Sequence, residues 1–310
     1  MTLDGIRKGT LVVLCIGLTA LASCSNRGDG NVVVVYTSQD QLYASEILNA
    51  FTRDTGIEVL PLFDSESVKT TGLMNRLLAE KHRPRCDVFW SNEETMLRRL
   101  VKKGVIEEES LVTFGYRTRR LVVNTNLVEA VDIPRSMEAL TDLRWRGRVA
   151  LAYPLHGTTV THLMALRAQW GEGQWQTWCR ELLDNETLVV DGNSAVVRLV
   201  GQGKAWLGLT DSDDIAVGLR NGFPIRQVEL TQEYPPIANS AAMVVDGPHP
   251  NAARQFLEYL QKESTVNRLV ELGALEGVEF SDVNRLSIDW NEVMGSFDDS
   301  YRWLGETFFR

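Results

Sequence analysis

The residues VVVVYTSQDQLYASEILNAFTRDTGIEV, 32–59, carry the pattern that decides the fold. Residues 32–38 form a continuous β-branched run, which is typical of a strand covered on both faces. The next segment has apolar residues at Leu42, Ile47, Leu48 and Phe51, close to the helical period, and Gly56 predicts its end. The stretch therefore predicts a strand, a helix and a second strand.

The same alternation of apolar strands and amphipathic helices continues along the chain. Further strands are predicted at 57–63, 86–91, 148–154, 187–192, 204–210, 224–230 and 238–245, and the last helices at 251–272 and 288–310. This order indicates an α/β fold, with mostly parallel sheets flanked by helices. A chain of 310 residues is long enough for two such units.

Two segments have the character of connections between the two units. Residues 119–128 form a strand that leaves the first unit, and residues 237–245 form a strand that returns after the break at Pro235 and Pro236. We therefore expect two lobes joined by a hinge of two crossing strands. The expected boundaries are 32–122 plus 241–310 for lobe 1 and 123–240 for lobe 2.

The N-terminus has the features of an export signal. Arg7 and Lys8 precede an apolar run at 10–21, which is too short to span a bilayer as a helix. The residues LAS before Cys24 resemble a bacterial lipobox, so residues 1–23 are predicted to be a lipoprotein signal peptide and 24–31 a flexible tether. The alternatives are an ordinary signal peptide or a short buried helix. Lipidation at Cys24 predicts an extracytoplasmic, membrane-anchored protein.

Charge and cysteine content narrow the function classes. The net charge of −9 and the absence of a basic stripe argue against a nucleic-acid partner. Beyond Cys24, Cys86 and Cys179 are predicted to be buried free thiols, although an exported protein could also form a disulfide. No cysteine and histidine cluster has the spacing of a zinc site.

Four predicted strands end in polar residues that are followed by the start of a helix. Ligands of open α/β sheets bind beyond the carboxyl ends of the strands, and helix N-termini favour anionic or polar groups. The alternative is that these residues only cap the helices. The candidate ligand-binding residues at three of these ends are Thr37, Ser38, Gln39, Asn92, Glu93, Gly157, Thr158 and Thr159, and the fourth end holds the aspartates described next. Asn193 and Ser194 are further candidates at another helix start.

The stretch GLTDSDDIAV, 208–217, places three carboxylates where an apolar strand ends. Asp211, Asp213 and Asp214 either stabilise the first turn of a helix or hold a cation. Carboxylates suit hard metal ions, and they also bind ammonium or guanidinium groups by charge-assisted hydrogen bonds. Tyr234 is a further oxygen ligand candidate beside the expected hinge.

Several segments together resemble the ferric-iron class of solute-binding proteins of ABC importers. They are VVVVYTSQDQLYASEILNAFTRDTGIEV, CDVFWSNEE, RGRVALAYPLHGTTVTH, VVDGNSAVVRLVGQGKAWLGLTDSDDIAVGL and GPHPNAARQFLEYL. The resemblance implies a two-lobed type II periplasmic-binding fold that closes on its ligand. It also implies Fe³⁺ as the transported ligand, no catalytic cofactor, and an importer permease with its ATPase as partners. We expect a monomer.

The resemblance also suggests roles for individual residues. The segment at Gly157, Thr158 and Thr159 corresponds to one that binds the anion accompanying the metal, and Asn193 to a residue that hydrogen-bonds the ligand. A pair of adjacent tyrosines in the family is replaced here by Asp213 and Asp214. The predicted metal ligands are Asp213, Asp214, Glu93 and Tyr234.

Three alternatives to an iron carrier are left open. The same fold could bind an organic solute that bears an amine or a phosphonate. An extracytoplasmic hydrolase could use an aspartate pair as acid and base, but no GxSxG, HExxH or P-loop motif is present. The third alternative is an adaptor without a ligand. We expect a binding protein rather than an enzyme.

Overall fold

The computed structural model describes residues 31–64, 71–228, 230, 235–278 and 288–309. The lipidation candidate Cys24 and the ligand candidate Tyr234 lie outside these residues. Within them, no helix combines the length and the apolar character needed to cross a membrane.

Lobe 1 is built on the parallel strands β1 (Val32–Thr37), β2 (Glu58–Phe63) and β3 (Val88–Ser91). Helix α1 (Gln41–Thr55) follows β1 and ends at Gly56, whose φ of 73° closes the helix in the left-handed region. The unit predicted from 32–59 is thus confirmed. Helices α2 (Thr71–Ala79), α3 (Thr95–Lys102), α8 (Pro250–Leu260) and α9 (Glu263–Leu272) complete the lobe.

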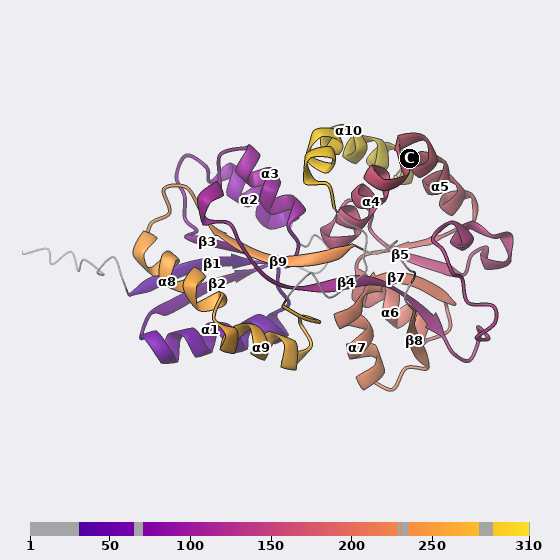
Figure 1. The fold of residues 1–310 in the computed structure, drawn as a ribbon, viewed down its shortest axis with the longest axis horizontal. Helices are drawn as coiled ribbons and strands as arrows, with labels where there is room; N and C mark the ends of the chain where they lie inside the picture. The colour runs from indigo at the N-terminus through magenta and orange to yellow at the C-terminus, as the bar shows by residue number, and fades with distance from the viewer. Residues whose placement is uncertain (1–30, 65–70, 229, 231–234, 279–287, 310) are drawn as a thin grey trace, which may run out of the picture.

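Lobe 2 repeats this plan on the strands β5 (Val149–Ala152), β6 (Leu188–Val190) and β7 (Leu207–Asp211), which are also parallel. Its helices are α4 (Gly157–Trp170), α5 (Glu172–Asp184), α6 (Asn193–Gly201) and α7 (Ser212–Arg220), and β8 (Ile225–Val228) pairs with β4 at the side. Figure 1 shows the two lobes side by side, each with helices on both faces of its strands.

Two long antiparallel strands, β4 (Val112–Asn124) and β9 (Pro236–Met243), connect the lobes. The first half of β4 pairs with β9, and its second half, from Arg119, pairs with β7. All described strands therefore form one mixed sheet that runs through both lobes. The two-lobed fold with a hinge of two crossing strands is confirmed, but β4 begins at Val112 rather than at Arg119 as predicted.

Helix α10 (Trp290–Phe308) contacts both lobes, whereas the sequence-based division assigned it to lobe 1. On α3, the Arg99 guanidinium pairs with Asp298 at 3.1 Å and lies over the Phe297 ring. On lobe 2, Arg167 of α4 pairs with Glu292 at 2.9 Å. Figure 1 shows α10 above the strands, reaching from α3 to α4.

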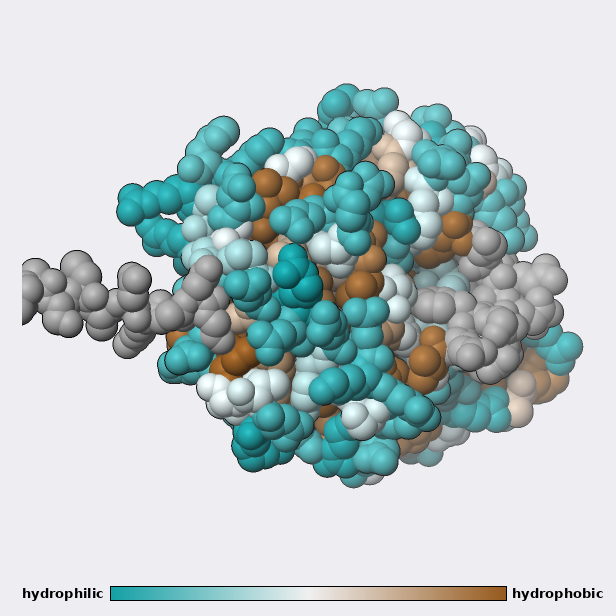
Figure 2. All heavy atoms as spheres, turned by 60° about the vertical axis from the view of Figure 1, so that its left-hand side comes forward, coloured by the Kyte–Doolittle hydropathy of each residue, from teal (hydrophilic) through white to brown (hydrophobic). Residues whose placement is uncertain are grey.

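The described surface is largely hydrophilic. Figure 2 shows mostly hydrophilic side chains on the face in view, with hydrophobic residues in small separate groups. Cys86 and Cys179 are buried free thiols, as predicted.

Candidate binding cleft

A polar cleft lies between the lobes. Lobe 1 contributes Asp40 and Asn92 to its walls, and β4 contributes Arg117. The remaining lining residues come from lobe 2: Ala152, Tyr153, His156, Gly157, Thr158, Thr159, Asp191, Gly192, Asn193, Asp211, Asp213 and Asp214. The polar ends of the parallel strands therefore meet at one place, as the topology requires.

The acidic segment begins helix α7 at the wall of the cleft. Asp211 is the last residue of β7 and the N-cap of α7, and Asp213 and Asp214 lie in the first turn. One carboxylate oxygen from each of the three can be chosen so that all lie within 4.8 Å of one another. Asp213 is buried and Asp214 is half-buried. The two readings of this segment, helix start and cation site, are therefore compatible.

Asp211 is the centre of a buried hydrogen-bond network. Its carboxylate accepts hydrogen bonds from Arg119 Nη1 at 2.9 Å, Thr158 Oγ1 at 2.7 Å and Asn193 Nδ2 at 2.9 Å. Arg117 Nη2 lies 3.2 Å away as a second ion-pair partner. With these contacts, Asp211 orients the side chains that line the cleft and is not itself open to a ligand.

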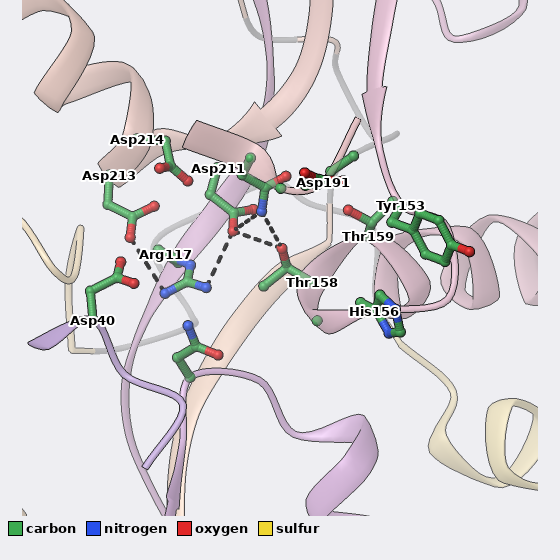
Figure 3. A pocket seen from close by; sticks show the side chains of 15 residues that line it. Asp40, Arg117, Tyr153, His156, Thr158, Thr159, Asp191, Asp211, Asp213 and Asp214 are labelled. Atoms are coloured by element: carbon green, nitrogen blue, oxygen red, sulfur yellow. Dashed lines mark hydrogen bonds and ion pairs between the residues drawn. The ribbon is translucent and has the colours of Figure 1, made fainter. Parts of the chain in front are cut away.

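The charges around Asp211 outweigh its burial. Burial alone would raise the pKa of the Asp211 carboxyl, but the guanidinium groups of Arg117 and Arg119 lower that pKa below its usual value. The pKa of Arg117 is in turn raised, since burial is opposed by the carboxylates of Asp213 and Asp211. Figure 3 shows the Arg117 guanidinium between these two aspartates, with Asp40 beside it.

The opposite end of the cleft is aromatic. The Tyr153 ring stacks on His156 with ring centres 4.8 Å apart, and on Phe309 at 4.1 Å. His156 Nδ1 lies 3.0 Å from Thr71 Oγ1, so this histidine contacts lobe 1 across the cleft. Burial lowers the pKa of His156, so the ring is neutral near pH 7.

The structure brings together most of the predicted binding residues. Asn92, Gly157, Thr158, Thr159, Asn193, Asp213 and Asp214 all line the cleft. Thr37, Ser38, Gln39, Glu93 and Ser194 do not. Two of them support the wall instead: Ser38 Oγ donates a hydrogen bond to Asn92 Oδ1 at 3.1 Å, and Gln39 Oε1 accepts one from Asn239 at 2.8 Å.

Glu93 caps helix α3 beneath the contact between the lobes. Its carboxylate accepts hydrogen bonds from the backbone N–H of Thr95 at 2.7 Å and of Met96 at 3.2 Å. Thr161 Oγ1 of α4 donates a third, at 2.9 Å, across the lobes. The backbone of α3 and a hydroxyl thus occupy the carboxylate that the sequence suggested as a metal ligand.

The buried position of Glu93 predicts a pH dependence of stability. Burial raises the pKa of Glu93 from 4.5 to about 7. Between pH 4.5 and 7 the folded protein keeps a proton on Glu93 that the unfolded chain has released. The free energy of unfolding therefore falls as pH rises through this range, by at most about 3 kcal/mol. Urea unfolding at several pH values measures this loss.

The variant Glu93→Gln is the matched test of that dependence. Glutamine keeps an acceptor for the backbone N–H groups but has no proton to lose, so its stability should change less between pH 4.5 and 7. A variant with the same pH profile as the parent would contradict the assignment to Glu93.

Sequence reasoning missed several residues of the cleft. Asp40 directly follows the predicted segment 37–39, and Asp191 precedes the predicted Asn193, so a wider window at each strand end would have found them. Arg117 gave no such signal, because the beginning of β4 was not recognised as a strand.

The fold and the cleft define a protein that binds a small solute between two lobes, and the sequence comparisons give the same class. Residues 32–273 match the family described as bacterial extracellular solute-binding protein, and the chain belongs to this family. Its members are not enzymes, so the family assignment confirms the expected binding role and excludes the hydrolase alternative.

Particular relatives are similar to this chain at low identity. "Iron uptake protein A1" of Synechocystis sp. is 23% identical over 297 residues, which covers 82% of this chain and 80% of the relative. Iron-bound HitA from Pseudomonas aeruginosa has a TM-score of 0.78 at 19% identity, covering 88% of this chain and 99% of that one. AfuA from Actinobacillus pleuropneumoniae, with fructose-6-phosphate bound, has a TM-score of 0.75 at 15% identity, covering 89% and 97%.

Proposed function

We propose that this protein captures ferric iron in the cleft between its lobes and delivers it to the permease and ATPase of an ABC importer. The observation that carries the proposal is the pair of carboxylates of Asp213 and Asp214 on the wall of an interlobe cleft, each with an oxygen within 4.8 Å of the other and of Asp211, which orients the site. Ferric iron is a hard cation and prefers oxygen ligands of this kind. The names of the iron-binding relatives support the same ion.

The ligands in this proposal are Asp213 and Asp214, with Asp40 from the opposite lobe. Asp211 is occupied by Arg119, Thr158 and Asn193, so it orients the site. An anion that accompanies the metal would bind at the N-terminus of α4, where Gly157 begins the helix and Thr159 offers a hydroxyl. We further propose that lipid on Cys24 anchors the protein to a membrane outside the cytoplasm.

A second candidate ligand is an organic solute that carries both a cationic and an anionic group. The observation that favours it is the length of the cleft, which continues from the aspartates to Tyr153 and His156. The likeness to AfuA, whose structure holds fructose-6-phosphate, shows that this fold accommodates organic ligands.

Iron binding to the metal-free protein tests the first candidate. Ferric nitrilotriacetate is added with and without carbonate, excess is removed by gel filtration, and bound iron is measured by mass spectrometry. We expect one iron per chain in the parent. A parent that takes up no iron under either condition would reject the proposal and favour the organic ligand.

Substitution of single aspartates tests the proposed ligands. Asp213→Asn and Asp214→Asn should each weaken iron binding at least ~10-fold, because each removes a charged oxygen ligand. Asp299→Asn is the control, since Asp299 is an exposed aspartate on α10, away from the cleft. Unchanged binding in both cleft variants would show that iron is held elsewhere.

A further inference from the structure

Arg117 lies where the two lobes meet. It belongs to the part of β4 that pairs with β9, two residues before β4 begins to pair with β7. Its side chain is 4% exposed, and its guanidinium lies in the cleft among the aspartates (Figure 3). Nη2 is 3.2 Å from Asp211 and Nη1 is 3.5 Å from Asp213.

Arg117 is held differently from its neighbour Arg119. Nη1 of Arg119 donates hydrogen bonds to Asp211 at 2.9 Å, Asn193 at 2.8 Å and Thr158 at 3.2 Å. Nε and Nη1 of Arg117 find no hydrogen-bond acceptor among the described residues, and the same holds for Nε and Nη2 of Arg119. The difference is that Arg117 has no counterpart to the three hydrogen bonds from Nη1 of Arg119. The 3.5 Å separation from Asp213 also exceeds a normal hydrogen bond. Charge, more than directed hydrogen bonding, therefore keeps the Arg117 guanidinium in place.

The position of Arg117 matters because carboxylates of both lobes face it. Asp40 belongs to lobe 1, and Asp213 and Asp214 belong to lobe 2. Without a cation between them, these like charges would repel one another as the lobes approach. The guanidinium of Arg117 supplies a positive charge between these carboxylates even when no ligand is bound.

We propose that Arg117 is an internal counter-cation, which takes the place of the metal when the cleft is empty and leaves Asp213 when the metal binds. This inference rests on the proposed iron-binding function. Arg117 then has two effects: it allows the empty lobes to close, and it competes with the incoming cation for the aspartates. This competition lowers the affinity for the metal below the value that the carboxylates alone would give. The lower affinity also makes release of the metal to a permease easier.

The variant Arg117→Gln tests both effects. Removal of one positive charge next to the metal should raise the affinity for iron ~10-fold, measured by competition of the metal-free protein with nitrilotriacetate. In the absence of iron, repulsion among the aspartates should hold the lobes apart, so small-angle X-ray scattering should give a larger radius of gyration than for the parent. Added iron should restore the compact value.

Two control variants separate charge from packing. Arg117→Lys keeps the positive charge and should behave like the parent. Arg146→Gln removes an exposed positive charge of lobe 2 that pairs with Glu186, outside the cleft, and should change neither iron affinity nor compactness. Equal or weaker iron binding by Arg117→Gln would overturn the inference, since it would mean that the guanidinium holds an anion or is only structural.

Failure of the inference is distinguishable from failure of the proposed function. If the parent binds iron and Arg117→Gln binds it no better, only the role of Arg117 is rejected. If the parent binds no iron, the proposed function is rejected, and the inference with it. If the variant does not fold, a crystal structure of the iron-loaded parent decides: a guanidinium withdrawn from Asp213 supports the inference, and one still in contact with Asp213 overturns it.

Discussion

Asp211→Asn is expected to lower the free energy of unfolding by about 3–5 kcal/mol, the usual cost of removing one partner from a buried ion pair. The substitution leaves the guanidinium groups of Arg117 and Arg119 buried without the carboxylate that both contact. Asparagine has nearly the same shape, so the loss reflects charge rather than a cavity. Urea unfolding, followed by tryptophan fluorescence, measures it.

The control for Asp211 is Asp191→Asn. Asp191 lines the same cleft but is exposed, so its neutralisation should change stability by no more than about 0.5 kcal/mol. A cost below about 1 kcal/mol for Asp211→Asn would mean that the two arginines find other partners. The network around Asp211 would then not be what orients the cleft.

Gly115→Ala is expected to destabilise the protein by about 2–5 kcal/mol, because two costs add at this position. Gly115 has a φ of 77°, in the left-handed region, at the irregularity in the pairing of β4 with β9. A Cβ there would lie 2.7 Å from Leu275 Cδ1 and 2.8 Å from the backbone oxygen of Gly277. Thermal or urea unfolding of the variant measures the combined cost.

Gly56→Ala separates the two costs. Gly56 has nearly the same φ, 73°, but a Cβ added there has no neighbour within 4 Å. Its substitution should therefore cost only the backbone strain, about 1–2 kcal/mol. Equal losses in the two variants would show that β4 moves away from Leu275 and Gly277 at little cost.

Local patterns predicted the lobes because each unit of the fold is encoded in a short stretch. The β-branched run at 32–37, the apolar positions of α1 and the glycine at 56 fix one strand and one helix without information from the rest of the chain. The polar ends of parallel strands then fix one edge of the sheet. For this reason Asn92, Thr158, Asn193 and Asp213 could be placed together from sequence.

The first half of β4, the place of Arg117 and the burial of Glu93 could not be predicted from the sequence. Each of them depends on contacts between residues that are far apart in the chain. The segment before Arg119 alternates apolar residues at Val112, Phe114 and Tyr116, but Gly115 interrupts it, and its strand character depends on its irregular pairing with β9. Arg117 was missed with it. The position of Glu93 after a strand end suggests a ligand, whereas its burial against Thr161 of α4 depends on how the lobes meet.

The contact of α10 with both lobes bears on how fast a solute can enter. Separation of the lobes must break either the contacts with Arg99 or those with Arg167. Entry then requires a minor, open population of the empty protein, and the apparent dissociation constant rises in inverse proportion to that population. A chain that ends before Trp290, and so lacks α10, should therefore bind its cargo faster. Its contacts with the bound cargo should change less, because α10 does not supply the proposed ligands.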